Sequence, residues 1–152
     1  MKADLARNIA MVCHYGQRDR FGDLVVEHLA RVAGAVPVEA QATAWLHDAM
    51  ESSDADPAEL TARGLTAVEL AALELLTRTP SELYELHALR IAHAPGEEGR
   101  LARVVKLADL DDHLAHRRAP AGAPPYAWAR RHISSAQYLR HELGDAAAPG
   151  AA

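Results

Sequence analysis

The segment AQATAWLHDAME, residues 40–51, decides the fold class of this sequence. Its alanine, leucine, methionine and glutamate residues are strong helix formers, and a Trp-Leu pair gives the helix an apolar side. His47 and Asp48 then stand side by side, with Glu51 one turn later. A histidine next to an aspartate is common by chance, so the rest of the chain has to distinguish a metal site from an ordinary polar helix edge.

The same composition extends along the chain and predicts an all-α protein. Ala, Leu, Glu and Arg dominate, and no Val/Ile-rich alternating segment of strand length stands out. Pro57 suits a helix start, Gly64 a helix end, and Thr66 with Glu69 has the spacing of a capping box. The predicted helices cover residues 4–15, 24–34, 37–51, 57–64, 66–78, 81–94, 100–117 and 126–143. We therefore expect a compact single-domain helical bundle of roughly seven or eight helices.

Length and charge limit the functional classes. The 152 residues suffice for one domain with its own core, predicted at residues 1–143, followed by a flexible C-terminal tail at residues 144–152. A net charge of −5 argues against a basic surface for nucleic acid, so no nucleic-acid partner is expected. A small anionic substrate held by a metal ion and a few local cations is compatible with this charge.

Cysteine content and hydropathy bear on the compartment. Cys13 is the single cysteine, which rules out an internal disulfide and a cysteine-based zinc cluster. The start, MKADLARNIA, carries charges where a signal peptide needs an apolar block. No run of about 18 apolar residues is present. We expect a cytoplasmic protein that does not enter the membrane.

Four residues are polar in apolar surroundings: His28, His47, Asp48 and Asp109. Each has an ordinary explanation, since a histidine can be a satisfied core residue and Asp109 can pair with Lys106 three residues away. Together they form a mixed nitrogen and oxygen set that suits Mn²⁺, Fe²⁺, Zn²⁺, Co²⁺ or Ni²⁺. With no thiolate among them, an open catalytic site is favoured over a structural zinc site.

Glu51 lies on the same side of its helix as His47 and Asp48, because it follows them by four and three residues. A carboxylate at this position could hold or deprotonate a water molecule beside a bound ion. The spacing by itself leaves two interpretations open, a metal site and an ordinary polar helix edge.

Three segments in order resemble a known family. They are ARNIAMVCHYGQRDRFGDLVVEHLARVA, AWLHDAMESSDADPAELTARGLTAVELAALELLTR and RVVKLADLDDHL. The order His, His-Asp, Asp resembles the HD-domain superfamily of metal-dependent phosphohydrolases, an all-α fold. The surrounding residues are most similar to the hydrolase domains of (p)ppGpp synthetase/hydrolases and their small stand-alone relatives. The resemblance covers about residues 5–117.

The resemblance implies a role for each matching position. His28, His47, Asp48 and Asp109 match the ligands of one divalent ion, usually Mn²⁺, and Glu51 matches a carboxylate that positions the attacking water. Candidates for substrate binding are Arg20, Lys106, Arg90, Tyr84, Ser52 and His113. A small phosphorylated substrate, a nucleotide in the first instance, is the expected partner.

Two departures leave the substrate open. Ser52 stands where the family has a second acid, and His113 stands where it has an asparagine, from which it could reach a phosphate or a second ion. The leading prediction is therefore a metal-dependent phosphohydrolase of a nucleotide or other small phosphorylated metabolite. The alternatives are a (p)ppGpp 3′-pyrophosphohydrolase and a non-catalytic nucleotide- or metal-binding HD protein. The last helix, WARRHISSAQYLRHEL, suits a solvated surface or a dimer face, so a homodimer also stays open.

Overall fold

The computed structural model describes residues 1–19, 22–116 and 125–143, with no description of the side chains of residues 125–130 and 143. The described residues form helices and no β-strand, apart from one isolated bridge between Arg18 and Leu24. The elements are α1 (Ala3–Cys13), α2 (Val25–Gly34), the short 3₁₀ helix η1 (Val38–Ala40), α3 (Gln41–Leu46), α4 (Ala49–Ser52), α5 (Pro57–Ala62), α6 (Ala67–Leu76), α7 (Tyr84–His93), α8 (Gly96–His116) and α9 (Pro125–Leu143). The predicted all-α single-domain bundle is confirmed. The predicted tail at residues 144–152 lies outside the described residues.

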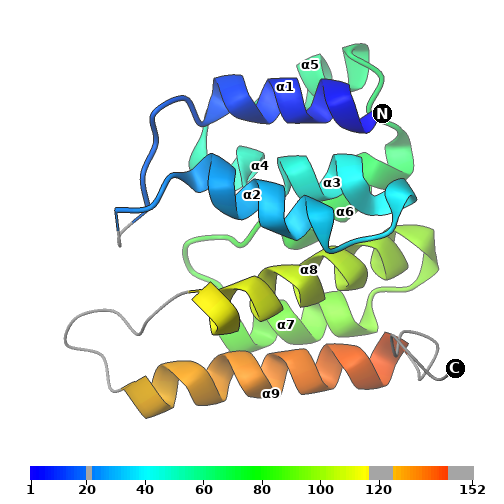
Figure 1. Ribbon diagram of the computed structural model, residues 1–152. Coiled ribbons are helices and arrows are strands. Elements are labelled where there is room, and N and C mark those ends of the chain that lie inside the picture. The colour runs from blue at the N-terminus through cyan, green and yellow to red at the C-terminus, as the bar shows by residue number, and fades with distance from the viewer. Residues whose placement is uncertain (20–21, 117–124, 144–152) are drawn as a thin grey trace, which may run out of the picture.

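The helices are stacked in the order that Figure 1 shows, with α1 at one end, α9 at the other and α2, α3, α6 and α8 between them. Helix α8 is central to this stack, because it packs against α2, α3, α6, α7 and α9. Its neighbours contribute fully buried leucine or isoleucine side chains to a shared core. These core residues are Leu29 of α2, Leu46 of α3, Leu73 of α6, Ile91 of α7, Leu110 of α8 and Leu139 of α9.

Two helix starts follow the local signals in the sequence. Helix α5 begins at Pro57, and the side chain of the preceding residue, Asp56, caps it by accepting a hydrogen bond from Ala58 N–H. Thr66 and Glu69 form the predicted capping box at the start of α6. Between these helices Gly64 has a φ of +93°, a left-handed conformation that glycine adopts without steric cost.

Three predicted boundaries were wrong. The single helix expected over residues 37–51 is divided into η1, α3 and α4, and His47 and Asp48 lie at the break between α3 and α4. Helix α7 begins at Tyr84 instead of Ser81, because the Glu82 N–H donates to Thr79 O in a preceding turn. Helix α8 begins at Gly96, so most of the turn expected before it is helical.

The corner between α7 and α8 is tightly packed at Gly99. A Cβ atom at this position would lie 2.0 Å from the carbonyl oxygen of Ala94. Only glycine lets the backbone of the corner approach α8 this closely. The packing of this corner therefore fixes where α8 begins relative to α7.

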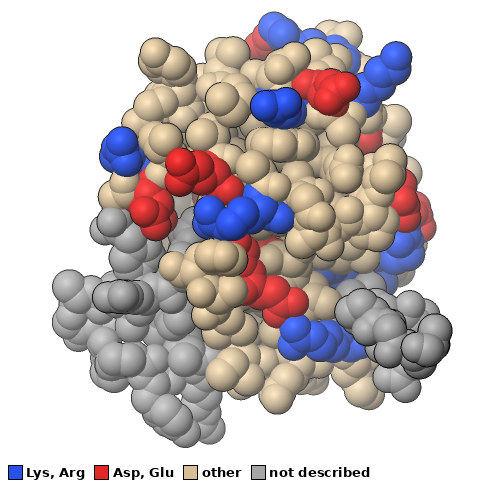
Figure 2. All heavy atoms as spheres, in the orientation of Figure 1, with Lys and Arg blue, Asp and Glu red and all other residues tan. Residues whose placement is uncertain are grey.

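Surface charge and hydropathy add two observations. On the face seen in Figure 2, the basic side chains lie interspersed with acidic ones and form no continuous patch. In the described part of the chain, no helix combines the length and apolar character needed to cross a bilayer.

Candidate metal centre

The four predicted ligands come together from three separate parts of the chain. His28 lies on α2, His47 and Asp48 lie at the break between α3 and α4, and Asp109 lies on α8. Exposure is 2% for His28, 5% for His47 and 3% for Asp109, whereas the Asp48 side chain is 34% exposed. The cluster therefore has a buried floor of two imidazoles and a carboxylate, with Asp48 at its solvent side.

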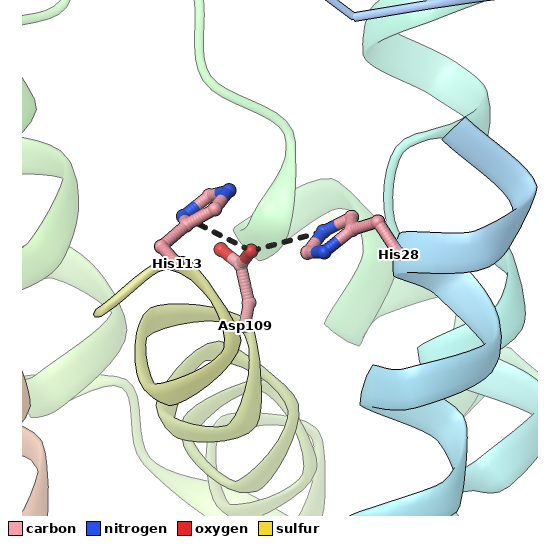
Figure 3. A group of neighbouring side chains, drawn as sticks. All are labelled: His28, Asp109 and His113. Carbon is pink, nitrogen blue, oxygen red and sulfur yellow. Dashed lines mark ion pairs between the residues drawn. The ribbon is translucent and has the colours of Figure 1, made fainter. Parts of the chain in front are cut away.

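One carboxylate oxygen, Oδ1 of Asp109, is the focus of the cluster. It lies 3.2 Å from His28 Nε2 and 3.9 Å from His47 Nε2. His113, one turn after Asp109 on α8, places its Nδ1 3.4 Å from the same oxygen. Figure 3 shows the Asp109 carboxylate between the imidazoles of His28 and His113. Asp48 Oδ1 lies 3.4 Å from His47 Nε2 and completes the group.

Among the four predicted ligands, two have a buried atom without a hydrogen-bond partner in the described residues: His47 Nε2 and Asp109 Oδ1. An unsatisfied buried polar atom costs about 1–3 kcal/mol, so native proteins rarely leave two side by side. A cation between them would satisfy both, because each offers a lone pair. The ligand atoms of His28, His47 and Asp48 all lie within 4.8 Å of one another, as do those of His28, Asp109 and His113. The residues present therefore fit a divalent ion.

Hydrogen bonds at Nδ1 orient the rings of His28 and His47, so that the Nε2 atom of each faces the other candidate ligands. His28 Nδ1 lies 2.7 Å from Asp112 Oδ2, and Arg31 Nε donates to Asp112 Oδ1 at 2.6 Å. His47 Nδ1 donates to the carbonyl oxygen of Ala44 at 2.8 Å. A proton held at Nδ1 leaves the Nε2 lone pair for an ion, and such outer partners are a regular part of histidine metal sites.

Asp112 and Arg31 were not predicted. A sequence signal exists only for Asp112, which follows Asp109 by three residues and so shares its helix face. Its hydrogen bond to His28 spans 84 residues of sequence. That distance in the chain explains why spacing alone did not reveal the contact.

The charges around Asp109 keep it ionised. Burial raises the pKa of the Asp109 carboxyl, but the ammonium of Lys106 and the nearby imidazoles outweigh this and hold the pKa well below its usual range. Lys106 Nζ donates to Asp109 Oδ2 at 2.8 Å. Burial lowers the pKa of Lys106, but Asp109 and its other neighbours raise it above its ordinary value. Lys106 thus occupies Oδ2 and leaves Oδ1 for the centre.

Asp48 and His28 shift in the directions that their neighbours dictate. Burial raises the pKa of Asp48, but the imidazole of His47 leads the effects that bring it below the ordinary value. Burial lowers the pKa of His28, but its contact with Asp109 and the charges of Asp109, Asp48 and Asp112 raise it overall. The carboxylates of Asp48 and Asp109 are therefore both ionised at neutral pH, the state in which they bind a cation.

Tyr84 and Lys106, both predicted to bind substrate, lie beside this centre. The Lys106 ammonium is 5.8 Å from the centroid of the Tyr84 ring, and the buried Tyr84 hydroxyl has no hydrogen-bond partner among the described residues. His132 of α9 is buried and was not predicted. Its ring lies 5.4 Å from the Tyr84 ring and 5.5 Å from the His113 ring, which connects these two candidates.

Glu51 and Ser52 lie on α4, directly after the His-Asp pair, and both are exposed. The Glu51 Oε2 atom accepts a hydrogen bond from the backbone N–H of Arg78 at 3.0 Å. The Ser52 carbonyl oxygen accepts one from Gln17 Nε2 at 3.3 Å. Glu51 is thus held by the segment that follows α6.

Arg90 is not brought to the centre. Its guanidinium forms a bidentate pair with Glu82, through Nε at 2.9 Å and a terminal nitrogen at 3.0 Å, and also donates to Thr77 O. Arg20 lies outside the described residues.

The chain matches no protein-family model, and it has no significant match among curated proteins. Its function is therefore inferred from the residues themselves. The main structural result is that the ligand atoms of His28, His47 and Asp48, and likewise those of His28, Asp109 and His113, come together in groups that could hold a metal ion.

Proposed function

We propose that the protein is a metal-dependent phosphohydrolase of the HD-domain type that acts on a nucleotide or another small phosphorylated metabolite. The observation that carries this proposal is that two buried atoms without a hydrogen-bond partner in the described residues, His47 Nε2 and Asp109 Oδ1, face the imidazole of His28 and the carboxylate of Asp48. A polar group of this kind is costly to bury unless a ligand satisfies it. A site of this composition, open on the side of Asp48, favours catalysis over a purely structural ion.

His28, His47, Asp48 and Asp109 would hold the ion, for which the sequence resemblance suggests Mn²⁺. When bound, a divalent ion supplies Lewis acidity toward a phosphoryl oxygen and lowers the pKa of a coordinated water. The two ionised carboxylates balance the double positive charge, which suits a partly buried site.

The proton acceptor and the phosphate-binding groups would come from Glu51, Lys106 and Tyr84. Glu51 follows Asp48 by three residues, and its carboxylate would accept the proton of the water that attacks phosphorus. The hydrogen bond from Arg78 N–H restrains this side chain. Lys106 and the Tyr84 hydroxyl would orient the phosphate, because a cation and a buried unpaired donor both suit phosphate oxygens.

The test is a hydrolysis assay on the full chain after chelator treatment and addition of Mn²⁺, Fe²⁺ or Co²⁺. The substrate panel contains nucleoside mono-, di- and triphosphates, ppGpp and sugar phosphates, and the assay measures released phosphate and pyrophosphate. Asp109→Ala is the control without a metal centre. Glu51→Gln tests the proton acceptor, and we expect it to keep metal binding while turnover falls by about 10²–10⁴-fold.

The outcomes separate the alternatives. Metal-dependent release that is absent in Asp109→Ala supports the phosphohydrolase and names its substrate. Pyrophosphate release from ppGpp selects the alarmone hydrolase in spite of Ser52. Tight metal binding with no turnover on any phosphate ester overturns the proposal in favour of a binding protein.

A further inference from the structure

The two candidate ligand groups of the cluster have one residue in common. His28 belongs to the group with His47 and Asp48 and also to the group with Asp109 and His113. Such an overlap is compatible with two neighbouring ions or with one ion that all five residues share. The hydrogen bonds of His28 distinguish these arrangements.

His28 has a single nitrogen available for an ion. Its Nδ1 is engaged by the Asp112 carboxylate at 2.7 Å, so only Nε2 faces the cluster. An imidazole nitrogen has one lone pair and binds one ion at a time. Because both groups need the same lone pair, they describe one centre rather than two.

The three separations around Asp109 Oδ1 agree with one ion. Two ligands that each lie about 2.1 Å from an ion are about 3.0 Å apart at a right angle and about 4.2 Å apart on opposite sides. Around Asp109 Oδ1, the three ring nitrogens lie at 3.2, 3.4 and 3.9 Å. All three values fall in that interval, including the one for His113.

The ring of His113 lies next to the rings of two other histidines. It is parallel to the His28 ring, with centroids 5.1 Å apart and planes within 4°. On another side the ring of His132 meets it at 85°, at a centroid distance of 5.5 Å. Figure 3 shows His113 and His28 approaching the Asp109 carboxylate from different helices. The position of the His113 ring beside Asp109 Oδ1 follows from its place one turn after Asp109 on α8.

We propose that His113 is a fifth ligand of this ion, and that the resulting three-imidazole, two-carboxylate site selects Fe²⁺, Co²⁺, Ni²⁺ or Zn²⁺ over Mn²⁺. Imidazole suits these ions, whereas carboxylate and water suit Mg²⁺ and Mn²⁺, so each added imidazole moves the preference in this direction. The inference rests on the metal centre of the proposed function but makes no assumption about the substrate. It gives His113 a role at the ion instead of the substrate-binding role expected from the sequence.

The experiment measures metal affinity and the electronic spectrum, without reference to turnover. Metal-free full-length protein is titrated with Co²⁺, Zn²⁺ and Mn²⁺ in competition with a chromophoric chelator, and the Co²⁺ absorption bands are recorded. The variants are His113→Ala and His113→Phe, of which the second keeps a flat ring between His28 and His132 but has no donor nitrogen. His132→Ala is the matched control for packing, and His47→Ala is the control for loss of an established candidate ligand.

We expect both His113 variants to bind Co²⁺ and Zn²⁺ at least about tenfold more weakly, since even outer-shell changes cost that much. The Co²⁺ bands should shift in both, while Mn²⁺ affinity falls less, and His132→Ala should retain the wild-type spectrum. Unchanged Co²⁺ affinity and spectrum in His113→Phe, with binding lost in His47→Ala, would overturn the fifth ligand and leave the proposed function standing. If the wild-type chain binds none of the ions, the metal centre itself fails, and with it the proposed function.

Discussion

The molecule contains two clusters built around buried histidines, and they differ in how well their polar atoms are satisfied. In the first, His87 of α7 is 1% exposed, and its Nδ1 lies 3.2 Å from Glu82 Oε2, while Arg90 binds the same carboxylate through two nitrogens. In the second, His47 Nε2 and Asp109 Oδ1 are buried and without a hydrogen-bond partner in the described residues. The polar atoms of the first cluster are satisfied by one another, whereas the second contains buried atoms that a cation would satisfy.

The difference shows what identifies a candidate site in this fold. A buried histidine next to a carboxylate occurs in both clusters, so that pattern does not distinguish structure from function. The unsatisfied atoms do, because their burial is costly until a ligand binds. Arg90, which the sequence resemblance suggested for substrate binding, belongs to the first cluster and stabilises Glu82.

The largest effect that separates the clusters is expected at their central carboxylates. Asp109→Asn removes the charge that three imidazoles face, so we expect metal affinity to fall by more than about a hundredfold, beyond the usual cost of an outer-shell change. Isothermal calorimetry with Co²⁺ and Mn²⁺ measures this directly. Glu82→Gln, the same change in the first cluster, is the matched control and should bind both ions as the wild type does. Equal losses in the two variants would contradict the distinction.

The next effect concerns the support of His28. Asp112→Asn keeps the size of the side chain but removes the charge that holds His28 Nδ1 and Arg31, and we expect metal affinity to fall by about 10–100-fold. The neighbouring Asp111 is the control, because its exposed side chain pairs with Arg140 at 2.6 Å, away from the ligands. Asp111→Asn should leave the affinity unchanged. A loss of affinity as large in the Asp111 variant would show that Asp112 has no special role.

We expect the cluster of Glu82, His87 and Arg90 to contribute to stability and not to metal binding. Glu82→Ala removes the acceptor of Arg90 and His87, and a hydrogen bond to a charged group contributes about 1.5–3 kcal/mol, so we expect a loss of about 2 kcal/mol in the free energy of unfolding. Urea denaturation measures it. Glu59→Ala breaks an exposed pair with Arg63 and should cost less than about 1 kcal/mol. Weakened metal binding in the Glu82 variant would link the two clusters and remove the contrast.

The smallest effect is a difference in histidine titration in the metal-free protein. Burial is the main cause that lowers the pKa of His87 to about 4, whereas the carboxylates around His28 raise its pKa above 6.5. NMR titration of the ring protons should show His87 neutral down to about pH 4 and His28 protonated above pH 6.5. Parallel titration of the two residues would contradict the assigned environments.

The same shifts predict opposite dependences of stability on pH. Between pH 6.5 and about 4, His87 is protonated in the unfolded chain but neutral in the folded state. The contribution of His87 to stability therefore falls as the pH falls through this range. His28 contributes stability that is fully present below pH 6.5 and is lost as the pH rises through its raised pKa. Denaturation of a His87→Leu variant at several pH values isolates the first contribution, which should disappear.

Much of the fold was predictable because the helix signals are local. Pro57 and the pair Thr66 and Glu69 begin helices at the predicted residues, since capping depends on groups within one turn. The start of α7 was not predictable in this way. The Arg78 guanidinium donates to Glu82 O at 3.0 Å and helps to hold a turn where the helical pattern of the sequence had already begun.

In the candidate site, too, the residues with a local sequence signal were predicted and those placed by packing between helices were not. His28, His47, Asp48 and Asp109 were predicted as a set from their polar character in apolar surroundings, and the structure places each within 4 Å of another member of the set. The contacts of Asp112 and His132 depend on how α2, α8 and α9 are rotated against one another, and no local spacing encodes that rotation. Distant packing decided which additional residues join the cluster.

The close approach at Gly99 has a consequence for the centre on the same helix. Asp109 lies about 15 Å further along α8, so a tilt of this helix at Gly99 would displace the Asp109 carboxylate. A methyl group at Gly99 would meet the backbone of Ala94 and would have to tilt or shift the helix at its start. The positions of Asp109 and His113 thus depend on the packing of a corner that carries no functional group, and substitutions at Gly99 should alter metal binding.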